Sequence, residues 1–409
     1  MDLTIFQRLI GPDGRTALNL AEQLAIREEE FLAGLAAMER GGVEGALACA
    51  ALETTILRRR AERKFSRAGA MFFTREALEQ ASGGDLSRHR AARFHGVGRI
   101  ADLGCGIGGD TIALAEHAPV LAVDREELRL RMARENVAVN NPSHGARFIL
   151  ADVISPGIAG VPGAGRIAVY SDPSRREEGR RVFSVRRYDP PLEILSAWHA
   201  SFPALPLCVK ISPGVRWEEI EREDCEVEFV SLCGELKEAV LWYGPFRSAQ
   251  RRATMLPEGA TLTDDARGSD AVSAPGRILY EPDPSVLRAG LVQQLAALLG
   301  AARIDPQIAY LTADVHVPSP WARAFPLEEV MPFSLKKLRA WLRERGVGRV
   351  VVKKRGSPIE PVALERQLRL RGDESRIIFL TKVSGKPWVL IAEREITKTE
   401  AVIATGAVL

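Results

Sequence analysis

Three aspartates, each placed in or directly after a short apolar run, are the residues of this chain best placed to do chemistry. They are Asp102, Asp124 and Asp152, and the runs around them read as buried strands. If these strands are parallel, their carboxyl ends meet at one edge of a sheet, where open α/β sheets bind ligands. We therefore expect the three carboxylates to bind a nucleotide-like ligand that carries several polar groups.

A glycine-rich turn follows the first of these strands and leads into a helix that starts near Thr111. Gly104, Gly106 and Gly108 remove side chains that would block a ligand. The spacing also fits a dinucleotide site, because an acid, Asp124, lies 20 residues after Gly104. A dinucleotide-binding strand would normally carry an apolar residue at the position of Asp102, however. A carboxylate there suits a ligand with a positively charged amino group.

With these residues the sequence resembles the class I S-adenosylmethionine-dependent methyltransferases. The resemblance implies that Asp102 faces the methionine ammonium, that Asp124 accepts the ribose hydroxyls and that Asp152 reaches the adenine amino group. Arg125 and Val153, which follow two of these acids, belong to the same expected cofactor site together with the glycines. Each acid also has a structural alternative, namely a turn acid, a helix N-cap and a loop residue, respectively.

The loop after the fourth expected strand is the candidate substrate side of the site. Amine-directed methyltransferases carry Asp or Asn there, then two prolines and an aromatic ring that stacks on the base. This chain keeps Asp172 and Pro173 but continues with Ser174 and Arg175. We expect Asp172, Pro173 and Arg175 to be the catalytic residues, with Asp172 orienting the nucleophile and Pro173 holding it extended.

Arginine is abundant in this loop and admits two functional interpretations. Arg175 can lay its guanidinium plane on a base, or it can hold phosphates together with Arg176, Arg180 and Arg181. The structural alternative is a basic loop on an enzyme surface.

An aromatic segment, Met71-Phe-Phe-Thr74, precedes the glycine-rich turn. Trimethylguanosine synthases, which methylate the exocyclic amine of a guanine, carry a similar segment before their first core strand and a similar glycine loop. That resemblance places Phe73 and Thr74 at the cofactor site. The alternative is a helix start, with Thr74 as its N-cap and the phenylalanines packed in a core.

Alternating strands and helices between residues 99 and 244 predict an α/β fold with a seven-stranded, Rossmann-like methyltransferase sheet. The last two strands should form an antiparallel hairpin, because Cys233-Gly-Glu-Leu is too short for a helical crossover. The strands are expected near residues 99–104, 119–124, 147–152, 166–171, 205–211, 226–232 and 237–243.

The flanking regions are expected to be separate. Residues 1–95 predict an N-terminal helical region, with one helix running from Thr16 to Gly41 and another over 43–64. Residues 246–275 are rich in Pro, Gly, Asp and Ser and read as an excursion or a linker at the end of the core, and residues 286–299 predict a single helix. The expected domains are the helical region 1–95, the core 96–275, a connecting region 276–331, a small module 332–395 and a tail 396–409.

Residues 332–395 predict a small α/β module with a capping Ser334 and a terminating Gly346, and they resemble the THUMP-like domain found behind bacterial methyltransferase cores. They hold 16 Lys and Arg against 7 Asp and Glu, a net charge of +9, in a chain whose total is +3. Such local charge indicates a polyanion partner, although a solvated basic face would have the same composition.

Composition excludes several classes of protein. No uncharged apolar run approaches ~20 residues, which argues against a membrane span, and the first residues lack a secretory signal, so a cytoplasmic protein is expected. Five cysteines without a C-x-x-C pair and six scattered histidines predict neither a disulfide framework nor a metal site.

The sequence therefore predicts an S-adenosylmethionine-dependent methyltransferase that acts on a nucleobase in RNA. The alternatives are a methyltransferase for protein or a small molecule, and a non-catalytic RNA-binding protein with a relict fold. A nucleotide-dependent dehydrogenase is disfavoured because it leaves Asp102 without a role.

Overall fold

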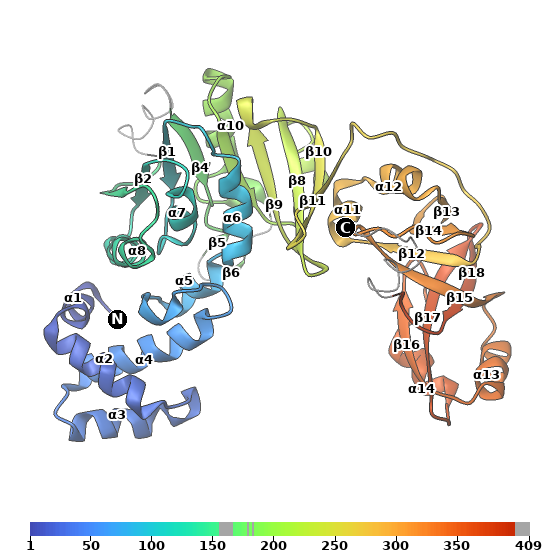
Figure 1. The fold of residues 1–409 in the computed structure, drawn as a ribbon, viewed down its shortest axis with the longest axis horizontal. Coiled ribbons are helices and arrows are strands. Elements are labelled where there is room, and N and C mark those ends of the chain that lie inside the picture. Colours follow the sequence, from blue (N-terminus) through green and yellow to red (C-terminus); the bar gives the residue numbers. More distant parts are fainter. Residues whose placement is uncertain (155–166, 178–179, 182–183, 397–409) are drawn as a thin grey trace, which may run out of the picture. The chain divides into compact units, whose positions relative to one another are not determined.

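The structure is a computed structural model that describes residues 1–154, 167–177, 180–181 and 184–396 (Figure 1). The chain divides into two compact units. The first comprises Met1–Cys225 and Ala239–Ser248, and the second comprises Glu226–Glu238 and the residues from Ala249 onward.

Helices make up the start of the first unit, as expected. One expected helix is wrong, because the segment from Thr16 to Gly41 is broken where Ala25 adopts a left-handed conformation with φ of 48°. Thr16 consequently lies inside a helix that begins at Pro12, a residue suited to the first helical turn. The helices are α1 (Leu3–Ile10), α2 (Pro12–Leu24), α3 (Phe31–Arg40), α4 (Gly45–Ala61), α5 (Arg75–Gln80) and α6 (Gly84–Ala92).

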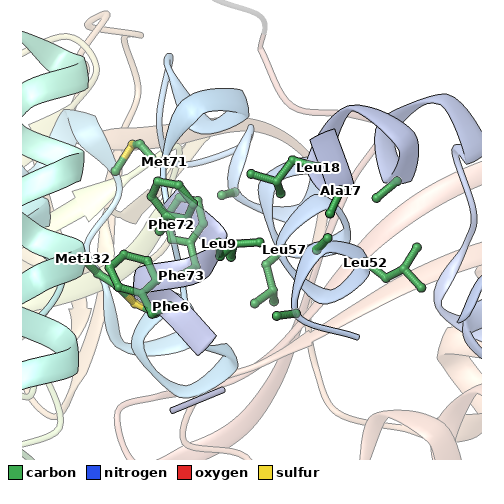
Figure 2. Close-up of a cluster of buried hydrophobic side chains, with 14 of the residues drawn as sticks. Phe6, Leu9, Ala17, Leu18, Leu52, Leu57, Met71, Phe72, Phe73 and Met132 are labelled. Atoms are coloured by element: carbon green, nitrogen blue, oxygen red, sulfur yellow. The ribbon is translucent and has the colours of Figure 1, made fainter. Parts of the chain in front are cut away.

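A buried apolar cluster joins helices α1 to α5 to the rest of the first unit. Phe6, Leu57 and Phe73 are almost completely buried in it, and Met132 joins them from helix α8 (Glu127–Asn140) (Figure 2). Ile107 of the glycine-rich turn belongs to the same cluster. Burial of apolar surface therefore sets the position of the helical region beside the turn, which is where a ligand is expected.

The main sheet has nine strands in the order β11-β10-β8-β9-β7-β4-β1-β2-β3. Its strands are β1 (Arg99–Leu103), β2 (Val120–Asp124), β3 (Ala146–Leu150), β4 (Ile167–Ser171), β7 (Leu207–Ile211), β8 (Cys225–Leu232), β9 (Glu235–Tyr243), β10 (Arg251–Leu256) and β11 (Ala260–Thr263). Strands β3, β2, β1, β4 and β7 pair in parallel, and β9 runs antiparallel to β7. Helix α7 (Gly109–Leu114) contacts β1 and β2, α8 contacts β2 and β3, and α10 (Leu192–Ser201) precedes β7 (Figure 1).

All seven expected strands are present, but the count of seven is wrong because β10 and β11 extend the sheet. They lie where the sequence indicates a linker. Pro257-Glu-Gly259 forms the tight turn of a hairpin, with Gly259 at φ of 71°, and strands β10 and β11 pair antiparallel across it. Pro and Gly at this point indicate a linker, but a hairpin turn requires the same residue types.

A second sheet of seven strands lies in the second unit, in the order β13-β14-β12-β15-β18-β17-β16. Residues 276–331, expected to connect two domains, supply four of its strands. The strands are β12 (Ile278–Pro282), β13 (Ala302–Asp305), β14 (Ile308–Ala313), β15 (Ala322–Pro332), β16 (Val347–Lys354), β17 (Glu374–Val383) and β18 (Lys386–Ala392).

Helices of the second unit follow the sequence prediction with one exception. The expected helix over 286–299 is two helices, α11 (Pro284–Ala289) and α12 (Val292–Leu299), because Gly290 ends the first with φ of 69°. Helix α13 (Leu335–Glu344) is capped by Ser334 as expected and precedes Gly346 at φ of 62°. Helix α14 (Pro361–Leu368) follows it in the chain. No helix of the described residues is both long enough and apolar enough to cross a membrane.

Candidate functional site

A cavity of about 390 Å³ lies at the carboxyl ends of β1, β2, β3 and β4. Its volume is typical of a small-molecule site. Eight of the residues expected at the site line it, and they are Asp102, Gly104, Gly106, Asp124, Arg125, Asp152, Val153 and Asp172. Parallel pairing brings these residues together from four strand ends that are distant in sequence.

The glycine-rich turn opens one wall of the cavity. Gly104 and Gly106 have φ values of 84° and 54°, which strongly favour glycine, and a Cβ added to Gly106 would meet no atom within 4 Å. Gly108 has another function, since a Cβ there would lie 3.2 Å from Ala133. Gly104 and Gly106 therefore leave space beside the cavity, whereas Gly108 allows the turn to pack on α8.

Asp124 organises the turn through its carboxylate. Its two oxygens accept hydrogen bonds from the backbone N–H groups of Gly106 (2.8 Å) and Glu126 (2.9 Å). A carboxylate can accept about four hydrogen bonds, so acceptor capacity remains for two ligand hydroxyls. Asp152 is exposed and accepts only the N–H of Ile154 (3.0 Å) among the contacts of the described residues.

Asp102 lies at the floor of the cavity with 1% of its surface exposed. Its carboxylate accepts a hydrogen bond from the Thr111 hydroxyl at 2.5 Å, and no lysine or arginine of the described residues forms an ion pair with it. Burial raises the pKa of Asp102 to about 8, and the nearby Asp110, Asp172 and Asp124 act in the same direction. A cationic ligand group would supply the missing counter-charge, which fits the ammonium of an amino acid moiety.

A further acid of the cavity, Asp110, is partly buried, has its own partners and was not expected from the sequence. It accepts hydrogen bonds from Arg90, from Ser87 (2.6 Å) and from the Tyr170 hydroxyl (2.7 Å). Burial alone would raise the pKa of Asp110, but the charges of Arg90 and Lys210 and these hydrogen bonds lower it to about 2. The position of Asp110 in the turn Gly108-Gly-Asp110 is a local signal from which the sequence could have placed it near the site. Arg90 gives no such signal, because it lies in the separate helix α6.

Asp172, in the loop after β4, is paired with a lysine that sequence reasoning also missed. The Lys210 ammonium, on β7, donates to the Asp172 carboxylate at 2.5 Å, and the lysine side chain is only 5% exposed. The available signal was a lysine within the apolar strand Leu-Cys-Val-Lys-Ile. Asp172 therefore has a fixed counter-ion, whereas neither Asp102 nor Asp124 forms an ion pair with another described residue.

The loop after Asp172 forms a wall of the cavity together with Asp189 and Pro190. The backbones of Ser174 and Asp189 exchange hydrogen bonds of 2.8 and 3.0 Å, and both residues line the cavity. Arg125, expected at the cofactor, forms an ion pair with Asp189 at 2.6 Å. Pro173 is buried, while Arg175 is partly exposed, and neither lines the cavity.

Three further arginines of this loop, Arg176, Arg180 and Arg181, lie in the short strands β5 (Arg176–Glu177) and β6 (Arg180–Arg181). Strands β5 and β6 pair antiparallel. The side chains of these arginines lie outside the described part of the structure.

Phe73 and Thr74 are not among the residues that line the cavity. Phe73 is 1% exposed and packs against Phe65, with ring centroids 5.7 Å apart. The Thr74 hydroxyl accepts the Ala77 N–H at 3.1 Å, so Thr74 is the N-cap of α5. Glu76 and Ala77, in the first turn of that helix, do line the cavity. The aromatic segment therefore places α5 at the site.

The fold and the site together define a class of protein. Seven strands of the main sheet follow the order β3-β2-β1-β4-β7-β9-β8, in which β9 is antiparallel to β7. This order, the glycine-rich turn after β1 and the acids at successive strand ends are typical of a Rossmann-like methyltransferase. In the described residues, no group of three or more His, Cys, Asp and Glu side chains could hold a metal ion.

Comparison with known proteins identifies the family. The chain is 36% identical over 347 residues to two Mycobacterium tuberculosis proteins, MT3122 of strain CDC 1551 / Oshkosh and Rv3037c of strain ATCC 25618 / H37Rv. Both are described as uncharacterized S-adenosylmethionine-dependent methyltransferases, and the alignments cover 82% of this chain and 92% of theirs. The chain belongs to the S-adenosylmethionine-dependent methyltransferases, and S-adenosylmethionine is its cofactor.

Other comparisons support the architecture. Residues 322–394 match the THUMP domain-like family, and residues 2–61 match a domain of unknown function (DUF8688). The THUMP-like match begins at the first residue of β15, upstream of the expected boundary at 332. The fold is similar to a crystal structure of a Porphyromonas gingivalis W83 protein assigned to the methyltransferases, with a TM-score of 0.73 and 20% identity, over 91% of this chain and 100% of that one.

Proposed function

We propose that this methyltransferase modifies a nucleobase in RNA. The observation that carries the proposal is the THUMP domain-like region at residues 322–394, most of which belongs to the stretch of net charge +9. A segment of that charge favours a polyanion, and RNA offers both phosphates and a nucleophilic base. The sequence outside residues 332–395 has a net charge of −6, so the basic charge is local to this region.

The cofactor roles that we propose follow from the chemistry of the cavity. Asp102 binds the ammonium of the methionine moiety, Asp124 accepts the ribose hydroxyls, and Asp152 accepts the adenine amino group. Gly104 and Gly106 allow the ligand to approach the backbone. When bound, S-adenosylmethionine supplies an electrophilic methyl group on a sulfonium, whose sulfur leaves as a neutral thioether.

Asp172 is the residue that we propose orients the nucleophile. Its carboxylate accepts a hydrogen bond from the attacking amine or hydroxyl, while Lys210 fixes its direction through the 2.5 Å contact. Methyl transfer from a sulfonium needs alignment and exclusion of water more than a strong base. With the cofactor bound, Asp172 would hold the nucleophile in line with the methyl group, so that the bond to the methyl carbon would form as the carbon–sulfur bond breaks and the proton of the nucleophile would pass to solvent.

We further propose that the target is an exocyclic amine, as in the trimethylguanosine synthases that the Met71–Thr74 segment and the glycine loop resemble. Ser174 and Arg175 replace the second proline and the aromatic ring of amine-directed enzymes. A guanidinium plane can stack on a base, so we assign this role to Arg175.

The test is incubation of the protein with methyl-labelled S-adenosylmethionine and total cellular RNA, followed by nucleoside analysis. The proposal expects label in one modified nucleoside, with an Asp172→Asn variant as the control that binds cofactor and transfers poorly. Label in protein or in a small molecule would instead support those substrates. RNA binding without transfer to any acceptor would indicate a non-catalytic RNA-binding protein.

A further inference from the structure

A separate cavity of about 390 Å³ in the second unit is lined by three arginines, Arg343, Arg369 and Arg371. Arg343 lies in the last turn of α13, Arg369 is the C-cap of α14, and Arg371 precedes β17. Among the residues that the structure describes, no acidic residue lines this cavity. Three guanidinium groups around one cavity repel each other, so the arrangement favours a bound anion.

Interactions with the helix ends do not account for these arginines. Basic residues commonly complement the carbonyls at a helix C-terminus. Two other arginines make such contacts here. Arg339 donates to the Gln367 carbonyl at 2.8 Å, and Arg345 contacts the Trp341 carbonyl and lies 4.1 Å from the centroid of the Trp341 ring.

The arginines of the cavity behave differently. Arg343, Arg369 and Arg371 are exposed, and none makes a side-chain hydrogen bond or ion pair with another described residue. Their donors are therefore available to a ligand.

The backbone holds the arginine-bearing loop in place. A Cβ on Gly348 would lie 1.8 Å from the Gly372 carbonyl oxygen, and a Cβ on Gly372 would lie 2.0 Å from that of Gly346. The loop that carries Arg371 is joined to the turn after α13 by this close glycine packing and by a hydrogen bond. The Glu374 N–H donates to the Gly346 carbonyl at 3.2 Å. The backbone positions of Arg343 and Arg371 are thus fixed relative to each other before any ligand binds, which reduces the ordering cost of binding.

We propose that Arg343, Arg369 and Arg371 form a phosphate-binding site that takes the backbone phosphates of RNA. The planar guanidinium fork matches phosphate oxygens in a bidentate geometry, and the surrounding net charge of +9 favours a polyanion over a single small anion. This assignment rests on the proposed function, because it names how the same RNA substrate is held by the second unit.

The decisive experiment compares two triple variants with the same loss of charge. One is Arg343→Gln with Arg369→Gln and Arg371→Gln, and the matched control is Lys336→Gln with Lys337→Gln and Arg349→Gln. The control residues are exposed and belong to the same basic region. Affinity for a fluorescein-labelled short single-stranded RNA is measured for the full-length protein at several salt concentrations.

The site predicts that the arginine variant binds RNA about tenfold or more weakly than the control does. Loss of three phosphate contacts should reduce the slope of log affinity against log salt by about 2 in the arginine variant. Equal losses in the two variants would overturn the inference, since they would show a diffuse basic face. Equal thermal unfolding of the two variants checks that both are folded, and Arg→Lys at the three positions should recover only part of the affinity.

The outcome for the site can be separated from that for the proposed function. RNA that is bound through the three arginines but never labelled by S-adenosylmethionine would support the phosphate site and refute RNA methylation. RNA that is methylated while the two variants bind it equally would refute the site alone. If wild type binds no RNA, both are refuted.

Discussion

Cofactor binding should release a proton from Asp102, because the buried acid has no counter-ion until the ligand ammonium arrives. The pKa of Asp102 is about 8, raised chiefly by burial, so the side chain is mostly protonated at neutral pH in the free protein. Binding of an ammonium requires the carboxylate. At pH 6, about two units below this pKa, ionisation costs about 2.7 kcal/mol, since one pKa unit corresponds to about 1.4 kcal/mol.

Affinity for S-adenosylhomocysteine should therefore fall about 50-fold between pH 8, where about half of Asp102 is ionised, and pH 6, where about 1% is ionised. Calorimetric titrations in buffers of different ionisation enthalpy measure both the affinity and the number of protons released, which should approach one near pH 6. Asp102→Asn should bind weakly and lose this pH dependence. Constant affinity between pH 6 and 8, without proton release, would refute the assignment of Asp102 to the ammonium.

The same pKa shift has a consequence for stability. The folded-state pKa of Asp102 lies above its value of 3.8 in a model peptide, so the folded protein binds more protons than the unfolded chain between about pH 4 and pH 8. The contribution of Asp102 to the free energy of unfolding is fully present below about pH 4 and is lost as the pH rises to about 8. Without cofactor, Asp102→Asn should consequently be more stable than wild type at pH 8, as thermal unfolding would show.

Three further substitutions test the rest of the site. Asp124→Ala should weaken S-adenosylhomocysteine binding by about 1–3 kcal/mol, because ligand hydroxyls and the Gly106 N–H lose their acceptor; unchanged calorimetric affinity in a folded variant would contradict this role. Lys210→Met should lower the methylation rate about tenfold or more while cofactor affinity changes little, and a wild-type rate would show that Asp172 needs no support. Arg175→Lys keeps the charge but loses the planar stacking face, so it should slow RNA methylation at normal cofactor affinity, and equal rates would make the residue a surface arginine.

Sequence reasoning located the strand-end acids because a parallel sheet converts a repeated local pattern into one shared edge. Asp102, Asp124 and Asp152 each follow that pattern, and the structure places all three at one cavity. The same reasoning could not find Arg90 or Asp189, because they reach the site from helix α6 and from a segment outside the strands. Tertiary packing brings them to the site, and no local pattern indicates it.

The errors in the fold have similar physical causes. Ala25 ends α2 in a left-handed conformation that alanine rarely adopts. The residue type at this position therefore does not predict the break between α2 and α3. Gly290, by contrast, is a residue type that commonly ends a helix. The apolar character of residues 286–299 favours one continuous helix and conceals this signal. The strands β10 and β11 were missed because the turn between them has the composition of a linker.

Asp102 and Asp172 differ in whether a cationic side chain neutralises them, and Lys210 of β7 causes the difference. Lys210 compensates Asp172, whereas Asp102 has no ion-pair partner among the described residues. A cationic ligand group is therefore drawn more strongly to Asp102 than to Asp172. We infer that this division keeps the Asp172 carboxylate available to accept a hydrogen bond from the nucleophile, because the ammonium of the cofactor has a better site. Lys210→Met would leave Asp172 without its counter-ion, so the carboxylate would no longer be held in the direction that the nucleophile requires, while Asp102 would still bind the cofactor ammonium.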